Sequence, residues 1–356
     1  MTIRLFNRMM LLLSAPFTGM LAVILALDWS LPVPAFDTTP PPLAAPIDEP
    51  IVSRMSGLLD EARRDAETTG QLIRRFHELY ERTSKTAAVM AQTAAAASGL
   101  PDVIFDNRIA RVVGRPVRTV SGTNSDLKLY VFSTGTFNGY ALRVRLKTSA
   151  AARMVLGQDR VPGAETTLSA ALRYGATAGV NAGGFADDRA GRRYPLGATI
   201  LDGRWITRID PTADDLVFVG FNRSMRLVGT PYRSAADIDR LDPLFGASFA
   251  PVLLRDGRKE PIPAKWLTSP RRAPRTVVGR FRNDQLMFVV VDGYDERGSS
   301  GATLPELQDL LLQMRISDAY NLDGGGSSTL VFEGRIVNRP SDGRPRLLPT
   351  HFLFFR

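Results

Sequence analysis

The sequence predicts an α/β (mixed α+β) domain with a mixed sheet and a β-helix-β crossover near the C-terminus. Residues 286–291 form a continuous apolar run, typical of a strand buried on both faces. A helical apolar pattern follows at 303–314, and a second short strand pattern comes at 319–322. Because crossovers of this kind are right-handed, we expect the two strands to be parallel neighbours.

Residues 1–31 are predicted to be a transmembrane signal-anchor. Arg4 and Arg8 precede an uncharged run at 9–27, which is long enough to cross a bilayer as a helix. Positive charge before such a run predicts export of the remainder, hence a membrane-anchored, periplasmic or cell-surface location. A cleaved signal peptide is the alternative, although no convincing cleavage site follows the run.

Two segments are expected between this anchor and the globular domain. Residues 32–50 are rich in proline and predict an extended linker. Residues 51–98 carry apolar side chains at three- and four-residue spacing, which predicts a helical stalk, either one helix or a helical hairpin. The stalk either self-associates or packs on the main domain. A Gly-Leu-Pro sequence at 99–101 is expected to end it, leaving 100–356 as the globular domain.

The globular domain shows short strand patterns separated by turn residues. At the crossover helix, Thr303 and Glu306 have the spacing of a capping box, and Pro305 suits the first turn. Asp202-Gly203 is a strong hairpin turn. A second hairpin-like turn is expected at 253–257 and a further helix at 166–174. Strands are expected at 127–133, 140–146, 178–180, 200–206, 216–221, 276–281, 286–291, 319–322 and 329–332.

Composition narrows the chemistry. The net charge is +9, yet no stacking or groove-binding motif accompanies the basic residues, so we expect no nucleic-acid partner. A phosphate-rich or acidic glycan fits this charge better. The absence of cysteine excludes disulfides, thiolate metal sites and cysteine nucleophiles. His77 and His351 are the only two histidines, and each is expected to be structural.

Asp292 and Asp323 each follow one of the two strands of the crossover. Sites in α/β sheets form at the carboxyl ends of the strands, so both side chains are expected at one sheet edge. A pair of carboxylates is the usual equipment for cleaving a glycosidic bond, with one as acid and the other as base or nucleophile. Asp323 and Asp292 are therefore the candidate catalytic residues.

Two glycine-containing loops also follow strands. Residues 324–328 read Gly-Gly-Gly-Ser-Ser, which suits close backbone approach to a ligand or an anion nest. A Walker A lysine is absent from this loop. Asn181, Gly183 and Gly184 form a second loop of the same kind. Arg275, at the start of a strand, is suited to a bidentate contact with phosphate or carboxylate.

These pieces, in this order, resemble the phosphodiester glycosidase family. The most specific matching run is Asn-Leu-Asp-Gly-Gly-Gly-Ser-Ser at 321–328. The other matching runs are Val-Asn-Ala-Gly-Gly-Phe at 180–185, Pro-Arg-Thr-Val-Val-Gly at 274–279, Val-Asp-Gly at 291–293 and Val-Asn-Arg-Pro at 337–340. The resemblance covers roughly residues 125–356. It implies hydrolysis of a sugar-1-phosphodiester, releasing the sugar and leaving a phosphomonoester.

The resemblance also implies roles for individual residues. Asp323 and Asp292 would serve as acid and base or hold a metal, Arg275 and the 324–328 amides would hold phosphate, and Asn181 and Asn338 would orient sugar hydroxyls. The sequence requires no cofactor, although clustered aspartates permit a divalent metal. The expected substrate-binding residues are Asn181, Gly183, Gly184, Arg275, Thr276, Gly324, Gly325, Ser327, Ser328 and Asn338.

One departure from the family pattern concerns substrate choice. Many relatives carry an arginine just before the glycine where this sequence reads Ser299-Ser300-Gly301, and Arg297 would have to substitute for it. An envelope glycan or exopolysaccharide is the expected partner. Two alternatives stay open: a glycan-binding accessory protein of polysaccharide assembly, and a metal-dependent phosphodiesterase that cuts the P–O bond.

Overall fold

The computed structural model describes residue 18 and residues 49–209, 215–293 and 300–356. The predicted anchor run at 9–27, apart from Thr18, lies outside these residues, as does the linker up to residue 48. In the part of the chain so described, no helix is both long enough and apolar enough to span a membrane. As far as the described residues go, this finding contradicts the prediction of a transmembrane helix. The long helix α2 (Glu49–Val113) fails the requirement because charged side chains recur along it.

Helix α2 continues through residues 99–101, where the sequence predicted its end. The chain divides into two compact units, Met1–Ala91 and Gln92–Arg356. In the first unit the apolar side chains of α2 are exposed, for example Phe76 at 65% and Tyr80 at 73%. Because the structure contains a single chain, self-association through this helix stays a prediction.

The last turns of α2 belong to the core of the second unit, which explains why the helix passes the predicted stop. Phe105, Ile109 and Val113 recur every four residues and are buried. Phe105 also stacks beneath the guanidinium of Arg143, 4.6 Å from its ring centre. Burial of this apolar face offsets the backbone hydrogen bond that a proline at 101 removes.

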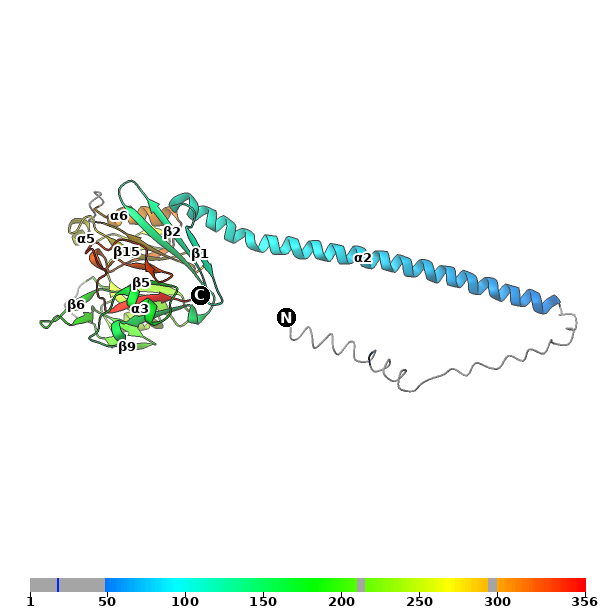
Figure 1. The fold of residues 1–356 in the computed structure, drawn as a ribbon, viewed down its shortest axis with the longest axis horizontal. Helices are drawn as coiled ribbons and strands as arrows, with labels where there is room; N and C mark the ends of the chain where they lie inside the picture. The colour runs from blue at the N-terminus through cyan, green and yellow to red at the C-terminus, as the bar shows by residue number, and fades with distance from the viewer. Residues whose placement is uncertain (1–17, 19–48, 210–214, 294–299) are drawn as a thin grey trace. The chain divides into compact units, whose positions relative to one another are not determined.

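An eight-stranded sheet dominates the second unit (Figure 1). Its order is β1 (Arg118–Ser121), β2 (Ser125–Ser133), β3 (Asn138–Leu146), β16 (Leu286–Val291), β15 (Arg275–Arg280), β17 (Asp318–Leu322), β13 (Val252–Arg255) and β14 (Arg258–Lys259). Helix α6 (Leu304–Gln313) connects β16 to β17 and has the predicted capping box of Thr303 and Glu306.

Two five-stranded sheets pack against the large one. One has the order β19 (Arg335–Ile336), β18 (Leu330–Phe332), β5 (Ala178–Asn181), β20 (Thr350–Phe354) and β4 (Ala152–Leu156). The other has the order β11 (Leu227–Pro231), β10 (Val217–Asn222), β12 (Pro243–Phe249), β8 (Thr199–Leu201) and β9 (Arg204–Thr207). Further elements are the ribbon β6 (Phe185–Asp187) and β7 (Arg193–Pro195), and helices α3 (Thr167–Arg173), α4 (Ala235–Asp239) and α5 (Ala264–Thr268).

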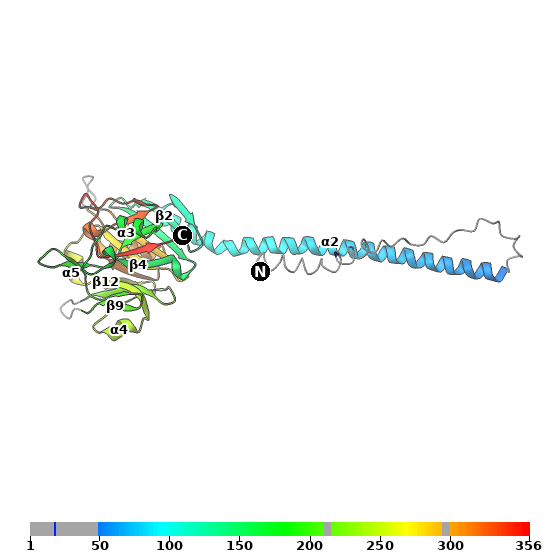
Figure 2. The same ribbon diagram turned by 60° about the horizontal axis from the view of Figure 1, so that its bottom comes forward.

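The layers follow from the alternation of side chains along each strand. In β16 the even-numbered side chains, such as Phe288, join the core between the sheets, and the odd-numbered ones, such as Val289, face α6 and the end of α2. Helix α3 covers the outer face of the β4–β5 sheet, and α4 lies beyond β9 and β12 (Figure 2). The predicted mixed helix-and-sheet architecture is confirmed, as is a strand β16 buried on both faces.

The crossover differs from the prediction in one respect that matters for the site. Strands β16 and β17 are parallel, as expected, because each pairs antiparallel with β15. They are not neighbours, since β15 lies between them. The first residues of β15 therefore come to the same sheet edge as the last residues of β16 and β17.

Candidate active site

Asp323 follows β17 at this sheet edge, and its backbone N–H donates to the carbonyl of Ala182 at 3.1 Å. Its carboxylate accepts hydrogen bonds from the Ser327 side chain and the Gly324 N–H. The other oxygen, Oδ2, is buried and has no partner among the described residues. Burial raises the pKa of Asp323 to about 6, against the opposing effect of these hydrogen bonds and two nearby arginines. A carboxyl of this kind can exchange a proton near neutral pH.

Asp292 follows β16 and is 3% exposed. Its Oδ1 accepts from the backbone N–H of Arg339 at 2.8 Å and from Asn338 Nδ2 at 3.3 Å. The Tyr140 hydroxyl donates to the same carboxylate. Burial nevertheless raises the pKa of Asp292 above its usual value, because the cost of desolvation outweighs these bonds. Burial of Tyr140 itself, together with the negative charge of Asp292, raises the pKa of Tyr140 to about 12.

Asn181 ends β5 and connects three segments of the site. Its Nδ2 donates to the Asp323 carbonyl at 2.7 Å. Its Oδ1 accepts from Thr276 Oγ1 at 2.9 Å and from the Thr329 N–H at 3.0 Å. The side chain is fully buried. Asn181 therefore acts as an internal clamp, and its predicted contact with sugar hydroxyls stays a prediction.

Asn338 is a second clamp of the same design. Its Oδ1 accepts from the Leu330 N–H at 2.8 Å, and its Nδ2 donates to the Ser328 carbonyl at 2.9 Å as well as to Asp292. Together with Asn181, it fixes residues 328–330 between the two aspartates. The structure thus brings Asp292, Asp323, Thr276 and both asparagines into one connected network.

The loop at 324–328 differs from the predicted nest of free N–H groups. The Gly325 N–H donates to the Pro274 carbonyl at 2.8 Å, and the N–H groups of Ser327 and Ser328 donate to carbonyls within the loop. These amides are therefore already bonded. Two side-chain oxygens here, Ser328 Oγ and Thr329 Oγ1, are buried without partners among the described residues.

Gly183 and Gly184 allow close packing of the second loop against β12. A Cβ atom on Gly183 would lie 2.6 Å from the Cβ of Ala247, and one on Gly184 would lie 2.9 Å from the Phe249 ring. Their N–H groups donate to Thr350 Oγ1 at 3.1 Å and to the Ser248 carbonyl at 3.0 Å. Both glycines position the loop that carries Asn181, and their contact with substrate stays a prediction.

Arg275 opens β15 and is 3% exposed. Its Nη2 donates to the Pro270 carbonyl at 2.8 Å, and its Nε donates to the Ala302 carbonyl at 3.5 Å. Arg275 thus joins the segments that enter β15 and α6. Its predicted contact with phosphate stays a prediction.

Two arginines that belong to none of the sequence motifs lie near Asp323. Arg346 donates to Ser327 Oγ at 3.3 Å and pairs with Asp342 at 2.7 Å. Arg193, on β7, pairs with Asp187 at 2.9 Å and donates to the Leu347 carbonyl. Both guanidinium groups act to lower the pKa of Asp323. Their sequence signal was only that arginines cluster at 192–193 and 344–346, which is common in a basic chain.

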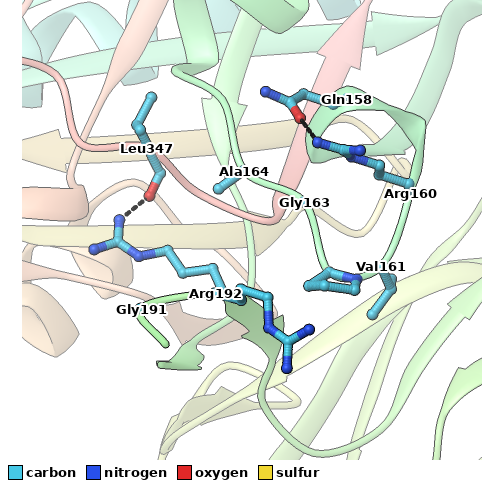
Figure 3. A pocket seen from close by; sticks show the side chains of 10 residues that line it. Gln158, Arg160, Val161, Gly163, Ala164, Gly191, Arg192 and Leu347 are labelled. Carbon is cyan, nitrogen blue, oxygen red and sulfur yellow. Dashed lines mark hydrogen bonds between the residues drawn. The ribbon is translucent and has the colours of Figure 1, made fainter. Parts of the chain in front are cut away.

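A pocket of about 460 Å³ adjoins Arg193 (Figure 3). Figure 3 shows Gln158 and Arg160 on one side and Arg192 across from them. The lining residues include three arginines and no acid: Gln158, Arg160, Val161, Pro162, Gly163, Ala164, Gly191, Arg192, Arg193 and Leu347.

Two other expectations concern metals and histidine. Within residues 49–209, 215–293 and 300–356, no three His, Cys, Asp or Glu side chains are grouped so as to hold a metal. Arg297 lies outside the described residues. His351 is buried, with Nε2 donating to the Leu348 carbonyl and Nδ1 accepting from Thr167 Oγ1, each at 3.1 Å. Burial lowers its pKa to about 4, so it is neutral at pH 7, as a structural histidine should be.

Parts of this chain are similar in sequence to known proteins. N-acetylglucosamine-1-phosphodiester alpha-N-acetylglucosaminidase of Bos taurus is 44% identical over 68 residues, covering 19% of this chain and 12% of that protein. The SPbeta prophage-derived uncharacterized protein YomE of Bacillus subtilis is 28% identical over 187 residues, covering 51% of this chain and 28% of that protein. The matches thus span less than a third of either relative.

A solved structure and a family model extend the comparison. The zebrafish N-acetylglucosamine-1-phosphodiester alpha-N-acetylglucosaminidase catalytic domain, auto-inhibited by its pro-peptide, aligns with a TM-score of 0.52 at 19% identity, covering 68% of this chain and 87% of that one. This alignment shows a common fold. The family model for phosphodiester glycosidases matches residues 174–355. Because that match spans just over half of the 356 residues of this chain, the chain belongs to the phosphodiester glycosidase family.

Proposed function

We propose that this protein hydrolyses the bond between a sugar and phosphate in a sugar-1-phosphodiester. The observation that carries the proposal is the carboxyl of Asp323, whose Oδ2 is buried without a partner among the described residues and whose pKa is raised to about 6. An unpaired buried carboxylate oxygen is costly to maintain for stability alone. Perturbed carboxyls of this kind cluster at functional sites.

The reaction assigned to Asp323 is proton transfer from water. Water attacks the anomeric carbon, the C1–O bond breaks, and its electron pair leaves with the phosphate oxygen as a phosphomonoester. The Asp323 carboxylate accepts the proton that the water loses. A phosphate leaving group is already anionic and leaves without strong acid assistance, so activation of water is the step that most needs the protein.

Asp292 is the second carboxylate of the proposal. It accepts from Tyr140, Asn338 and the Arg339 N–H, and so ties the 338–339 segment to the end of β16. The two asparagine clamps hold the backbone between Asp292 and Asp323. In this proposal the network fixes both carboxylates against the anomeric carbon, because small displacements of catalytic groups cost rate steeply.

The substrate class follows from the relatives and the charge of the chain. The Bos taurus and zebrafish relatives are named for action on N-acetylglucosamine-1-phosphodiesters, so N-acetylglucosamine is the first sugar to test. The net charge of +9 favours an anionic glycan, such as an envelope polysaccharide or exopolysaccharide. A divalent metal stays an option that chelation would test.

The test is hydrolysis of the methyl phosphodiester of N-acetylglucosamine-1-phosphate by the full chain and by Asp323→Asn. Asp309→Asn is the matched control, because Asp309 is an exposed carboxylate that pairs with Lys259 on the surface. We expect free sugar from wild type and the control, with a loss of about a hundredfold or more in Asp323→Asn. Full activity in a folded Asp323→Asn protein would refute the assignment of Asp323.

Isotope-labelled water separates the competing functions. Label in the released sugar indicates cleavage of the C–O bond, whereas label in the phosphate indicates a phosphodiesterase that cuts the P–O bond. Substrate binding without turnover would indicate the glycan-binding alternative. Loss of activity with a chelator, and its return with a divalent cation, would establish a metal requirement.

A further inference from the structure

The pocket lined by Arg160, Arg192 and Arg193 is positively charged, and the chemistry proposed for Asp323 gives this charge no role. Arg192 pairs with Asp188 at 2.7 Å, and Arg193 pairs with Asp187. Arg160 donates to the neutral Gln158 at 2.8 Å and has no ion pair within the described part of the chain. The pocket therefore carries an excess of positive charge, and its lining contains no acidic side chain.

The wall that holds Arg160 is rigidly built. A Cβ atom on Gly163 would lie 2.2 Å from the Gly157 carbonyl oxygen, so the turn closes tightly on itself. The N–H of Gln158 donates to Glu165 at 3.0 Å, and Glu165 pairs with Arg173 at 2.5 Å. Such support holds the Arg160 backbone in place, which lowers the entropic cost of binding an anion there.

The pocket is connected to the candidate active site by direct contacts. Arg193 lines the pocket and donates to the Leu347 carbonyl, and Leu347 also lines it. The next residue towards the site, Arg346, donates to Ser327, which donates in turn to Asp323. Arg193, which lines the pocket, also acts electrostatically on the Asp323 carboxyl, so the pocket and the candidate site share this residue.

We infer that this pocket binds a second phosphate on the aglycone side of the substrate, with Arg160 and Arg192 as specificity-determining residues. This inference rests on the proposed function. Guanidinium groups bind phosphate through paired charged hydrogen bonds, and Arg160 can exchange its neutral partner Gln158 for a phosphate. The substrate class is thus a sugar-1-phosphodiester whose leaving group carries a further phosphate. Both a nucleoside diphosphate sugar and a repeating sugar-phosphate polymer meet this description.

The test compares substrates with one and two phosphates, using the full chain. The methyl diester of N-acetylglucosamine-1-phosphate has one, whereas UDP-N-acetylglucosamine and a sugar-phosphate oligomer have more. In Arg160→Gln and Arg192→Gln we expect KM for the latter substrates to rise about tenfold, with kcat unchanged and the methyl diester affected less than about twofold. Arg223→Gln is the control, because Arg223 is as exposed as Arg192 and also pairs with an aspartate, Asp242.

Equal changes for all substrates, or no change for any, would overturn the inference. A KM effect confined to UDP-N-acetylglucosamine supports a nucleoside diphosphate leaving group, and one confined to the oligomer supports a polymer. Binding of inorganic pyrophosphate, measured by calorimetry, separates this inference from the proposed function. If no substrate is hydrolysed but pyrophosphate binds wild type more tightly than Arg160→Gln, the subsite stands and the proposed function fails. Equal pyrophosphate binding by both proteins would refute the subsite.

Discussion

The side-chain amide of Asn181 donates a 2.7 Å hydrogen bond to the backbone carbonyl of Asp323, connecting the end of β5 to the end of β17. The same side chain accepts bonds from Thr276 and from the Thr329 N–H. One buried amide therefore fixes segments from two sheets around the candidate carboxylate. Exchanging its donor for an acceptor would break a hydrogen bond of this network.

Replacing Asn181 by aspartate tests this clamp. The substitution removes the donor to Asp323 and places a carboxylate in a buried position, so we expect a loss of about 2–4 kcal/mol in the free energy of unfolding. Asn124→Asp is the control: Asn124 also donates to a backbone carbonyl, that of Arg356, but this hydrogen bond is exposed. Urea unfolding monitored by fluorescence gives both values. Similar losses in the two variants would contradict the role assigned to Asn181.

The raised pKa of Asp323 predicts how stability depends on pH. A carboxyl whose pKa is higher in the folded than in the unfolded state favours folding while it is protonated. That contribution is complete below the unfolded value near 4 and is lost as pH rises through about 6. Asp323→Asn should therefore be more stable than wild type above pH 6, by about 1–3 kcal/mol, with the difference vanishing below pH 4.

Asp318 provides the opposite case for comparison. Burial opposes its ionised form, yet bonds from Ser317, the Asp256 N–H and Arg280 outweigh burial and lower its pKa. Asp318→Asn should consequently be less stable than wild type at pH 7, and the difference should shrink as the pH falls. Thermal unfolding across pH 3–8 measures both variants. Parallel pH profiles for the two would show that Asp323 is not the perturbed group.

The activity of wild type should also follow the ionisation of Asp323. If its carboxylate accepts a proton from water, kcat/KM rises with pH and levels off above about 6. The phosphodiester stays singly charged over this range, and His351 is neutral above its pKa of about 4. A rate profile measured on the methyl phosphodiester would reveal the inflection. A fall in kcat/KM with rising pH through 6 would assign Asp323 the role of a general acid instead.

The glycines of the two loops should respond differently to alanine. In Gly183→Ala the new Cβ would meet Ala247 and the Ser248 carbonyl at 2.6 and 3.0 Å, so the strand would have to shift. We expect a loss of about 1–3 kcal/mol in stability. In Gly326→Ala the three atoms nearest the new Cβ would be at the ends of the Asp342 and Arg346 side chains, which can turn away. That variant should fold and show a changed kcat/KM. Equal losses of Tm in Gly183→Ala and Gly326→Ala would contradict this distinction.

The elements that the sequence predicts well are those with local causes. The apolar run of β16, the capping box of Thr303 and Glu306 and the Asp202-Gly203 hairpin depend on neighbours in the chain, and the structure contains all three. The helix end predicted at 99–101 was wrong because burial of Phe105 and Ile109 against the sheet overrides a local stop signal. Tertiary packing decides such cases.

Only those parts of the candidate site that depend on local sequence could be predicted. Asp292 and Asp323 could be placed at one sheet edge from the crossover alone. The insertion of β15 between their strands, and the arrival of Arg193 and Arg346 beside Asp323, depend on pairings between distant segments. The sequence pattern also did not predict that the Gly325 N–H bonds to the Pro274 carbonyl, because that bond depends on the position of a distant segment.

The place of β15 between β16 and β17 has a consequence for the order of folding. The β15–β16 hairpin closes over a short turn, so it can form early, whereas β17 must return across the whole of α6 to pair with β15. The hydrogen bond from Asn181 to Asp323 therefore has to wait for β17, and a chain in which β17 has not yet docked would have an unpaired strand edge and an incomplete candidate site. Amide exchange should accordingly protect the hairpin before it protects the residues around Asp323.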